Sequence, residues 1–97
     1  MYNIEFEPSA QEDLKSLRKF EQQQVVDSIE TQLRHEPTIE TRNRKRLRPN
    51  GIAAFELRVG QFRVFYNVDE KAWIVRIEAV GFKIGNLLFI RGESREL

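Results

Sequence analysis

The sequence predicts an α+β domain in which a two-helix hairpin packs on one face of a small antiparallel sheet, in the order β-α-α-β-β-β. Apolar residues recur at helical spacing over residues 9–35 and alternate with polar residues over residues 55–79, and turn-forming residues separate the alternating runs. The chain has 97 residues, of which 40% are hydrophobic, which is enough for one packed core and too few for two. We therefore expect residues 1–97 to form a single domain.

The N-terminal part of the chain predicts one strand and two helices. Apolar and polar residues alternate over residues 2–6, which is the pattern of a short strand with one buried face. Ser9 and Glu12 have the spacing of a capping box, so we expect the first helix to begin at Ser9 and to end near Lys19. A second apolar stripe predicts another helix over residues 21–35, and the two helices together form a hairpin.

The C-terminal part of the chain predicts strands that are joined by short turns. A polar, basic connection over residues 37–52 comes first. The expected strands then cover residues 55–59, 62–68 and 73–79. Gly60-Gln61 has the form of a two-residue hairpin turn, and residues 69–72 have that of a four-residue loop. A short apolar run follows at residues 87–90, and we expect a flexible, charged tail from about residue 91.

These turns fix a register that brings two arginines together. The two-residue turn sets Arg58 directly opposite Arg63 in the first hairpin. The four-residue loop sets Val68 opposite Trp73 in the second hairpin, and this register also places Glu78 opposite Arg63. Like charges that face each other across strands are destabilising, so the two guanidinium groups call for a nearby anion.

Two sources of that anion are open. The first is internal, because Glu56 lies two residues from Arg58 on the same face and Glu78 would face Arg63, so two salt bridges could neutralise both arginines. The second is an external phosphate group, which suits the planar fork of donors that a guanidinium presents.

The charge of the chain is concentrated in blocks, although the net charge is only +1. Residues 1–40 contain nine acidic and four basic residues, whereas residues 41–66 contain seven basic residues and one acidic residue. The remaining residues balance. A basic block of this kind indicates an anionic ligand bound at one place, and a solvated basic loop is the alternative interpretation.

The composition excludes several classes of site. The chain has no Cys, which excludes disulfides and thiolate metal sites, and its single His cannot form a zinc site alone. No apolar run approaches the roughly 20 residues that a membrane span needs. We therefore expect a cytoplasmic protein with no membrane association, no metal ion and no cofactor.

The arginine-containing hairpin carries a family pattern. It has the sequence Phe55-Glu56-Leu57-Arg58-Val59-Gly60-Gln61-Phe62-Arg63-Val64-Phe65-Tyr66. The run Val80-Gly81-Phe82-Lys83 follows it, and Pro37 ends the helical hairpin that precedes it. With these motifs the sequence resembles, over almost its full length, the RelE/ParE superfamily of bacterial toxins from type II toxin–antitoxin pairs. The resemblance implies two helices packed on an antiparallel sheet, and a cognate antitoxin protein as a partner.

The resemblance implies one of two activities. RelE-like members cut messenger RNA in the ribosomal decoding site without a metal ion, whereas ParE-like members inhibit DNA gyrase by binding. We expect the first activity, a ribosome-dependent mRNA endonuclease that inhibits translation, with the ribosome and mRNA as partners. A gyrase inhibitor that acts by binding and a catalytically inactive relative are the alternatives.

The resemblance also implies which residues form the site. Arg58 and Arg63 match phosphate-binding basic positions, and Lys83 matches the basic residue after the Val-Gly pair. Glu56 matches a polar active-site position and is the only acidic residue in its basic block, so it is the candidate general base. The C-terminal tyrosine of RelE-type enzymes corresponds to Phe89, which has no proton to donate. The basic run expected to contact ribosomal RNA backbone consists of Arg42, Arg44, Lys45, Arg46 and Arg48.

Overall fold

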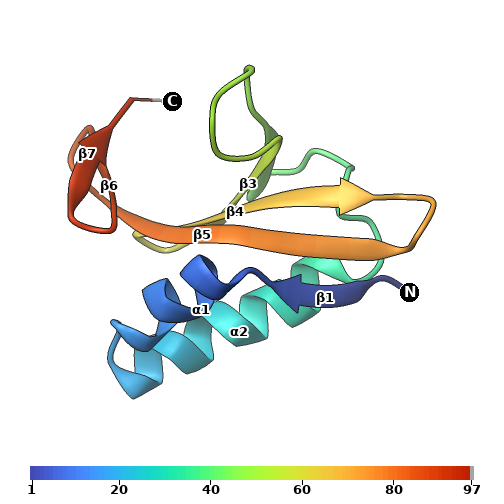
Figure 1. Ribbon diagram of the computed structural model, residues 1–97, viewed down its shortest axis with the longest axis horizontal. Helices are drawn as coiled ribbons and strands as arrows, with labels where there is room; N and C mark the ends of the chain where they lie inside the picture. The colour runs from blue at the N-terminus through green and yellow to red at the C-terminus, as the bar shows by residue number, and fades with distance from the viewer. Residues whose placement is uncertain (97) are drawn as a thin grey trace.

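The computed structural model describes residues 1–96 and confirms the predicted α+β fold. Helices α1 (Pro8–Lys15) and α2 (Lys19–Leu33) lie together on one side of the sheet (Figure 1). Within residues 1–96 the sheet has seven strands in the order β2-β3-β4-β5-β6-β7, and β1 pairs in parallel with β5. The strands are β1 (Asn3–Phe6), β2 (Arg44–Arg46), β3 (Phe55–Val59), β4 (Phe62–Asp69), β5 (Ile74–Ile84), β6 (Leu87–Ile90) and β7 (Glu93–Arg95). Neither helix of the described residues has the length and apolarity needed to cross a lipid bilayer.

Both helices have slightly different bounds from those expected. α1 begins at Pro8, whose ring suits the first turn of a helix because no intrahelical hydrogen bond is lost there. The predicted capping box is wrong, since the Ser9 hydroxyl donates instead to the backbone carbonyl of Glu78 at 3.5 Å. α2 begins earlier than expected, directly after Arg18, whose backbone amide donates to the Glu21 carboxylate at 3.0 Å.

The main core lies between the helices and the inner face of the sheet. Apolar side chains of β3, β4 and β5 pack there against one stripe of α2, as the alternation predicts. Leu57, Val64 and Ile29 are at most 1% exposed. Tyr66 is buried among them, and its hydroxyl donates to the backbone carbonyl of Pro37 at 2.7 Å. Burial raises the pKa of Tyr66, so the hydroxyl keeps the proton that it donates.

The turn between β4 and β5 differs from the expected one. Val68 pairs with Val75 and not with Trp73, so the predicted register of the second hairpin is wrong. Trp73 lies in the turn with a φ of 57°, a left-handed conformation that its residue type does not signal. A β-bulge between Phe65 and Tyr66 then shifts the pairing by one further residue.

This shift separates Arg63 from the carboxylate that was expected to face it. Arg63 pairs with Gly81, so the predicted position of Glu78 opposite Arg63 is also wrong. Glu78 accepts a hydrogen bond from the Asn67 side-chain amide at 3.1 Å instead. Gly81 is the small residue that this crowded place requires, because a Cβ atom there would overlap the backbone carbonyl of Phe89.

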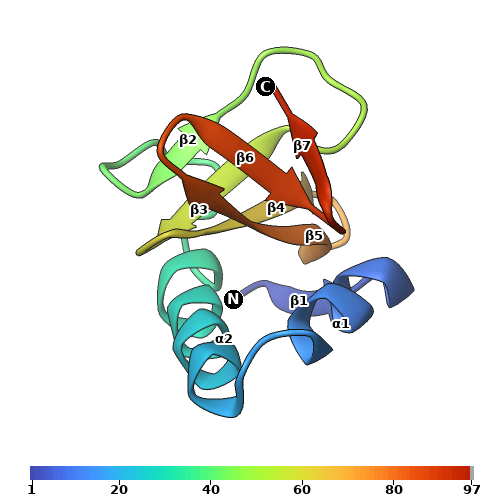
Figure 2. The ribbon, with the colours of Figure 1, turned by 90° about the vertical axis from the view of Figure 1, so that its left-hand side faces the viewer.

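The outer face of the sheet, opposite the helices, is partly covered by β6, β7 and residues 47–54 (Figure 2). A small second apolar cluster forms beneath them from Ala53, Phe65, Ala79, Leu88 and Ile90. The tail that the sequence analysis expects to be flexible from about residue 91 carries β7, which pairs with β6. β2 is a further strand that the sequence did not signal, because all three of its residues are basic.

Candidate functional site

A cleft of about 470 Å³ opens on the outer face of the sheet, between the β2–β3 side and the β6–β7 hairpin. Four basic side chains line it, and two carboxylates accompany them. The basic residues are Lys45, Arg58, Lys83 and Arg95, and the acidic residues are Glu56 and Glu96. The cleft therefore carries an excess of positive charge and can attract an anion, although only Lys45 and Arg58 come from the basic block of residues 41–66.

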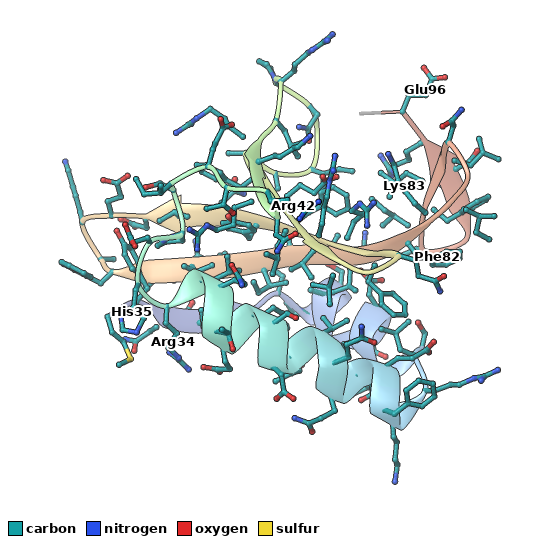
Figure 3. The ribbon with its side chains drawn as sticks, turned by 180° about the vertical axis from the view of Figure 1, so that it is seen from behind. Arg34, His35, Arg42, Phe82, Lys83 and Glu96 are labelled. Carbon is teal, nitrogen blue, oxygen red and sulfur yellow. The ribbon has the colours of Figure 1, made fainter. Side chains whose placement is uncertain are left out.

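Strand pairing explains why these side chains meet. Lys45 of β2 pairs with Glu56 of β3, and side chains at paired positions point to the same face of a sheet. Arg58 lies two residues further along β3, on that same face. Lys83 enters from β5 and points away from the helices, whereas its neighbour Phe82 points toward them (Figure 3).

Glu56 forms the floor of the cleft. Its residue exposure is only 7%, and its carboxylate accepts a hydrogen bond from Nε of Arg58 at 3.4 Å. The internal ion pair that the sequence left open is therefore present for Arg58. It is a long contact, and the Arg58 side chain remains 38% exposed, so part of its guanidinium can still reach a ligand.

Arg63 faces Arg58 across the hairpin, as predicted, but its guanidinium group has other partners. Nη1 of Arg63 donates to the backbone carbonyls of Gly60 at 2.8 Å and Phe62 at 2.9 Å. Its Nε is buried and has no hydrogen-bond partner within residues 1–96. Arg63 is not among the described residues that line the cleft, so the structure brings Arg58 and Lys83 together there and leaves Arg63 at the β3–β4 turn.

The basic run around β2 divides between the two sides of the sheet. Arg44 pairs with Leu57, and its guanidinium donates to the backbone carbonyls of Gln32 at 2.6 Å and Ile39 at 2.9 Å. Arg46 lies over the Phe55 ring at 4.6 Å. Only the residue between them, Lys45, lines the cleft. Of the two flanking residues of the run, Arg42 is exposed and Arg48 lines a separate shallow hollow formed by residues 46–54.

The position that the resemblance gives to a tyrosine, and the single histidine, both lie outside the described lining of the cleft. Phe89, at the position that the resemblance gives to a tyrosine, stacks on Phe82 with ring centroids 5.5 Å apart, and Phe82 points to the helix side. His35, the single histidine, lies at the opposite end of the molecule from Lys83 (Figure 3). The described lining of the cleft thus contains lysine, arginine and carboxylate groups, and neither tyrosine nor histidine.

Arg95 is the basic residue in the described lining of the cleft that the sequence analysis missed. It belongs to β7, and β7 folds beside β6 so that Arg95 and Leu88 are paired and both line the cleft. The available signal was a short apolar run followed by Arg91-Gly92, which is a possible hairpin turn. Within residues 1–96 there is no group of three or more His, Asp or Glu side chains that could hold a metal ion.

Comparison with known proteins gives a consistent result. The chain matches the family model described as the ParE toxin of the type II toxin–antitoxin system parDE, over residues 4–81. No curated protein matches the chain. It is similar to a chain in the crystal structure of the RelBE2 toxin–antitoxin complex from Mycobacterium tuberculosis, at 30% identity and a TM-score of 0.71, covering 84% of this chain and 98% of that chain. A chain of the archaeal RelE–RelB complex from Pyrococcus horikoshii has the same fold, at 22% identity and a TM-score of 0.66, covering 81% of this chain and 91% of that one.

Proposed function

The chain belongs to the RelE/ParE superfamily of toxins of type II toxin–antitoxin systems, and from this premise we propose that it is a ribosome-dependent mRNA endonuclease that inhibits translation. The observation that carries the proposal is the convergence of Arg58, Lys83 and Lys45 over the carboxylate of Glu56 in one cleft. A cognate antitoxin is its partner, as the two similar structures are toxin–antitoxin complexes. Messenger RNA and the cytoplasmic ribosome complete the proposed set of partners.

The proposed substrate is a single RNA strand whose phosphate group lies between Arg58 and Lys83. Arg58, on β3, offers a planar fork of donors, and Lys83, on β5, offers a compact ammonium group to the same cleft. Lys45 and Arg95 extend the positive surface along the strand. This arrangement replaces the phosphate position between Arg58 and Arg63 that the sequence suggested. The binding is electrostatic and should weaken steeply as salt rises.

The proposed reaction uses the 2′-hydroxyl of the substrate as the nucleophile. Its oxygen forms a bond to the adjacent phosphorus while the bond from phosphorus to the 5′-oxygen breaks, which leaves a cyclic phosphate and a 5′-hydroxyl. Arg58 and Lys83 stabilise the charge that develops on the phosphoryl oxygens. Glu56 takes the proton of the 2′-hydroxyl, and Lys83 donates a proton to the departing 5′-oxygen. Alignment of the strand in the cleft supplies the remaining acceleration.

Primer extension on a translated message tests this proposal. We expect induction of the chain to arrest growth and to produce new 5′ ends within translated messages, and not within the same message when its start codon is removed. Lys83→Met should abolish these ends, whereas Arg76→Met, which removes a basic residue of the same sheet outside the cleft, should not. Growth arrest without new 5′ ends would contradict the endonuclease proposal.

The second candidate function is inhibition of DNA gyrase by binding. The match of residues 4–81 to the ParE family model favours it, as does a cleft whose described lining contains neither tyrosine nor histidine. A supercoiling assay with purified gyrase separates the two functions. Inhibition of supercoiling together with intact messages would establish the second candidate, and an absence of both effects would indicate a catalytically inactive relative.

A further inference from the structure

An unusual side-chain contact fills a gap along the edge of β5. This edge is shared, because β1 pairs with its first part up to Ile77 and β6 pairs with its last part from Phe82 onward. Between them the Val80 amide donates to the carboxylate of Asp13 in α1 at 3.0 Å. The carboxylate thus takes the place of a strand partner, and its side chain is only 5% exposed.

The second oxygen of the same carboxylate holds the C-terminal hairpin. Nε of Arg91 lies 3.0 Å from Oδ1 of Asp13, and Nη2 of Arg91 donates to the backbone carbonyl of Glu78 at 3.2 Å. Arg91 lies at the turn between β6 and β7 with a φ of 52°. One buried carboxylate therefore connects α1, the centre of β5 and the turn of the hairpin, because each of its oxygens has a different partner.

The hairpin held in this way forms one wall of the cleft. β6 and β7 contribute Leu88 and Arg95, whereas the opposite wall comes from β2 and β3. The pairing that attaches the hairpin is short, covering Phe82 to Ile84 on the β5 side. From these contacts we propose that Asp13 and Arg91 form a positioning pair that sets Arg95 in the cleft for binding of a nucleic-acid phosphate. The choice of nucleic acid as the ligand rests on the proposed function. The claim that the pair holds the hairpin rests only on the contacts of Asp13 and Arg91.

Amide hydrogen exchange, which needs no ligand, tests whether the Asp13–Arg91 pair holds the β6–β7 hairpin in place. Arg91→Met removes the charge and keeps the aliphatic stem, and Asp13→Asn keeps an acceptor for Val80 while removing the charge partner of Arg91. Each change should accelerate exchange over residues 82–95 by roughly three- to tenfold, the range expected for losing one partly buried ion pair, and should leave β3 and β4 unchanged. Arg91→Lys should restore most of the protection.

The matched control is Arg76→Met. Arg76 resembles Arg91 in exposure, with side chains 40% and 43% exposed. Like Arg91, it forms ion pairs with N-terminal carboxylates, in this case those of Glu5 and Glu7. It lies outside the cleft, so its removal should leave exchange over residues 82–95 unchanged. Equal acceleration by Arg76→Met and Arg91→Met would overturn the inference.

Binding of a fluorescent single-stranded RNA, measured by anisotropy, tests the positioning part. Arg95→Met and Arg91→Met should each weaken binding by about fivefold, and Arg91→Met should add nothing further when Arg95 is already Met. A role in general stability alone would instead give effects that multiply, and that result would overturn the positioning of Arg95. If the unmodified chain binds no RNA, the positioning of Arg95 for a nucleic-acid phosphate is overturned, whereas primer extension on a translated message decides the proposed function and hydrogen exchange decides whether the pair holds the hairpin.

Discussion

The two sides of the sheet use basic residues for different purposes, and β2 shows the contrast within three residues. On the helix side, Arg44 donates to the backbone carbonyls of Gln32, near the end of α2, and of Ile39, in the connection that follows, and Arg46 covers the Phe55 ring. On the outer side, Lys45 faces the cleft together with Arg58. Position along the strand, and not the density of charge in the sequence, decides which basic groups a ligand can reach.

The largest effect should come from the helix side of β3. Leu57 is fully buried, so Leu57→Ala should lower the free energy of unfolding by about 3 kcal/mol through lost burial and a residual cavity. Urea unfolding followed by circular dichroism measures it. Glu56→Gln, at the neighbouring position on the outer face, should change stability by less than about 1 kcal/mol. Similar losses for the two variants would show that the two faces do not differ in this way.

The next largest effect should come from the outer side of β3. Arg58→Met should slow cleavage of a translated message by about a hundredfold, the usual cost of losing one donor to a developing oxyanion. The quantity to measure is the rate at which new 5′ ends form. The same variant should keep its fold and its antitoxin binding, and a cleavage rate within a factor of two of the unmodified chain would remove Arg58 from the proposed site.

Much of the fold follows from the sequence because its signals are local. The alternation over β3 and β4 and the Gly60-Gln61 turn determine the first hairpin, including the pairing of Arg58 with Arg63. The second hairpin could not be obtained in the same way. Its turn extends to Trp73 in a left-handed conformation without a glycine to mark it, and the bulge beside Phe65 has no sequence signal.

The site was predicted in part for the same reason. Glu56 and Arg58 lie on a strand whose faces the alternation sets, whereas Lys83 was expected only from the family resemblance, and the three do meet in the cleft. Arg63 was expected to join them because its position was known and the direction of its long side chain was not. Arg95 could not be expected, because its place depends on long-range packing of a hairpin at the end of the chain.

A smaller effect should separate Arg44 from the cleft. Arg44→Met removes two donors to backbone carbonyls, so it should lower the free energy of unfolding by about 1.5 kcal/mol. Thermal unfolding measures this loss. Because Arg44 lies on the helix side, message cleavage at a temperature where the variant is folded should be unchanged, and a specific loss of cleavage would assign Arg44 to RNA binding after all.

Arg63 offers a sharper version of the same contrast. Its Nη1 contacts hold the β3–β4 turn, so Arg63→Ala should reduce cleavage by no more than about fivefold, an indirect effect of a loosened turn. Rates for Arg58→Ala and Arg63→Ala should be compared in one primer-extension series. Equal losses would restore the site between the two facing arginines that the sequence suggested.

The most direct test compares two adjacent residues of β2 that point to opposite faces. The measurement is the ratio of message-cleavage rates for Lys45→Met and Arg46→Met, each folded and each lacking one positive charge. We expect Lys45→Met to cleave about fivefold more slowly than the unmodified chain, and Arg46→Met to cleave at its rate. If Arg46→Met cleaves as slowly as Lys45→Met, then cleavage depends on positive charge near β2 on either face of the sheet, and the outer cleft is not the site.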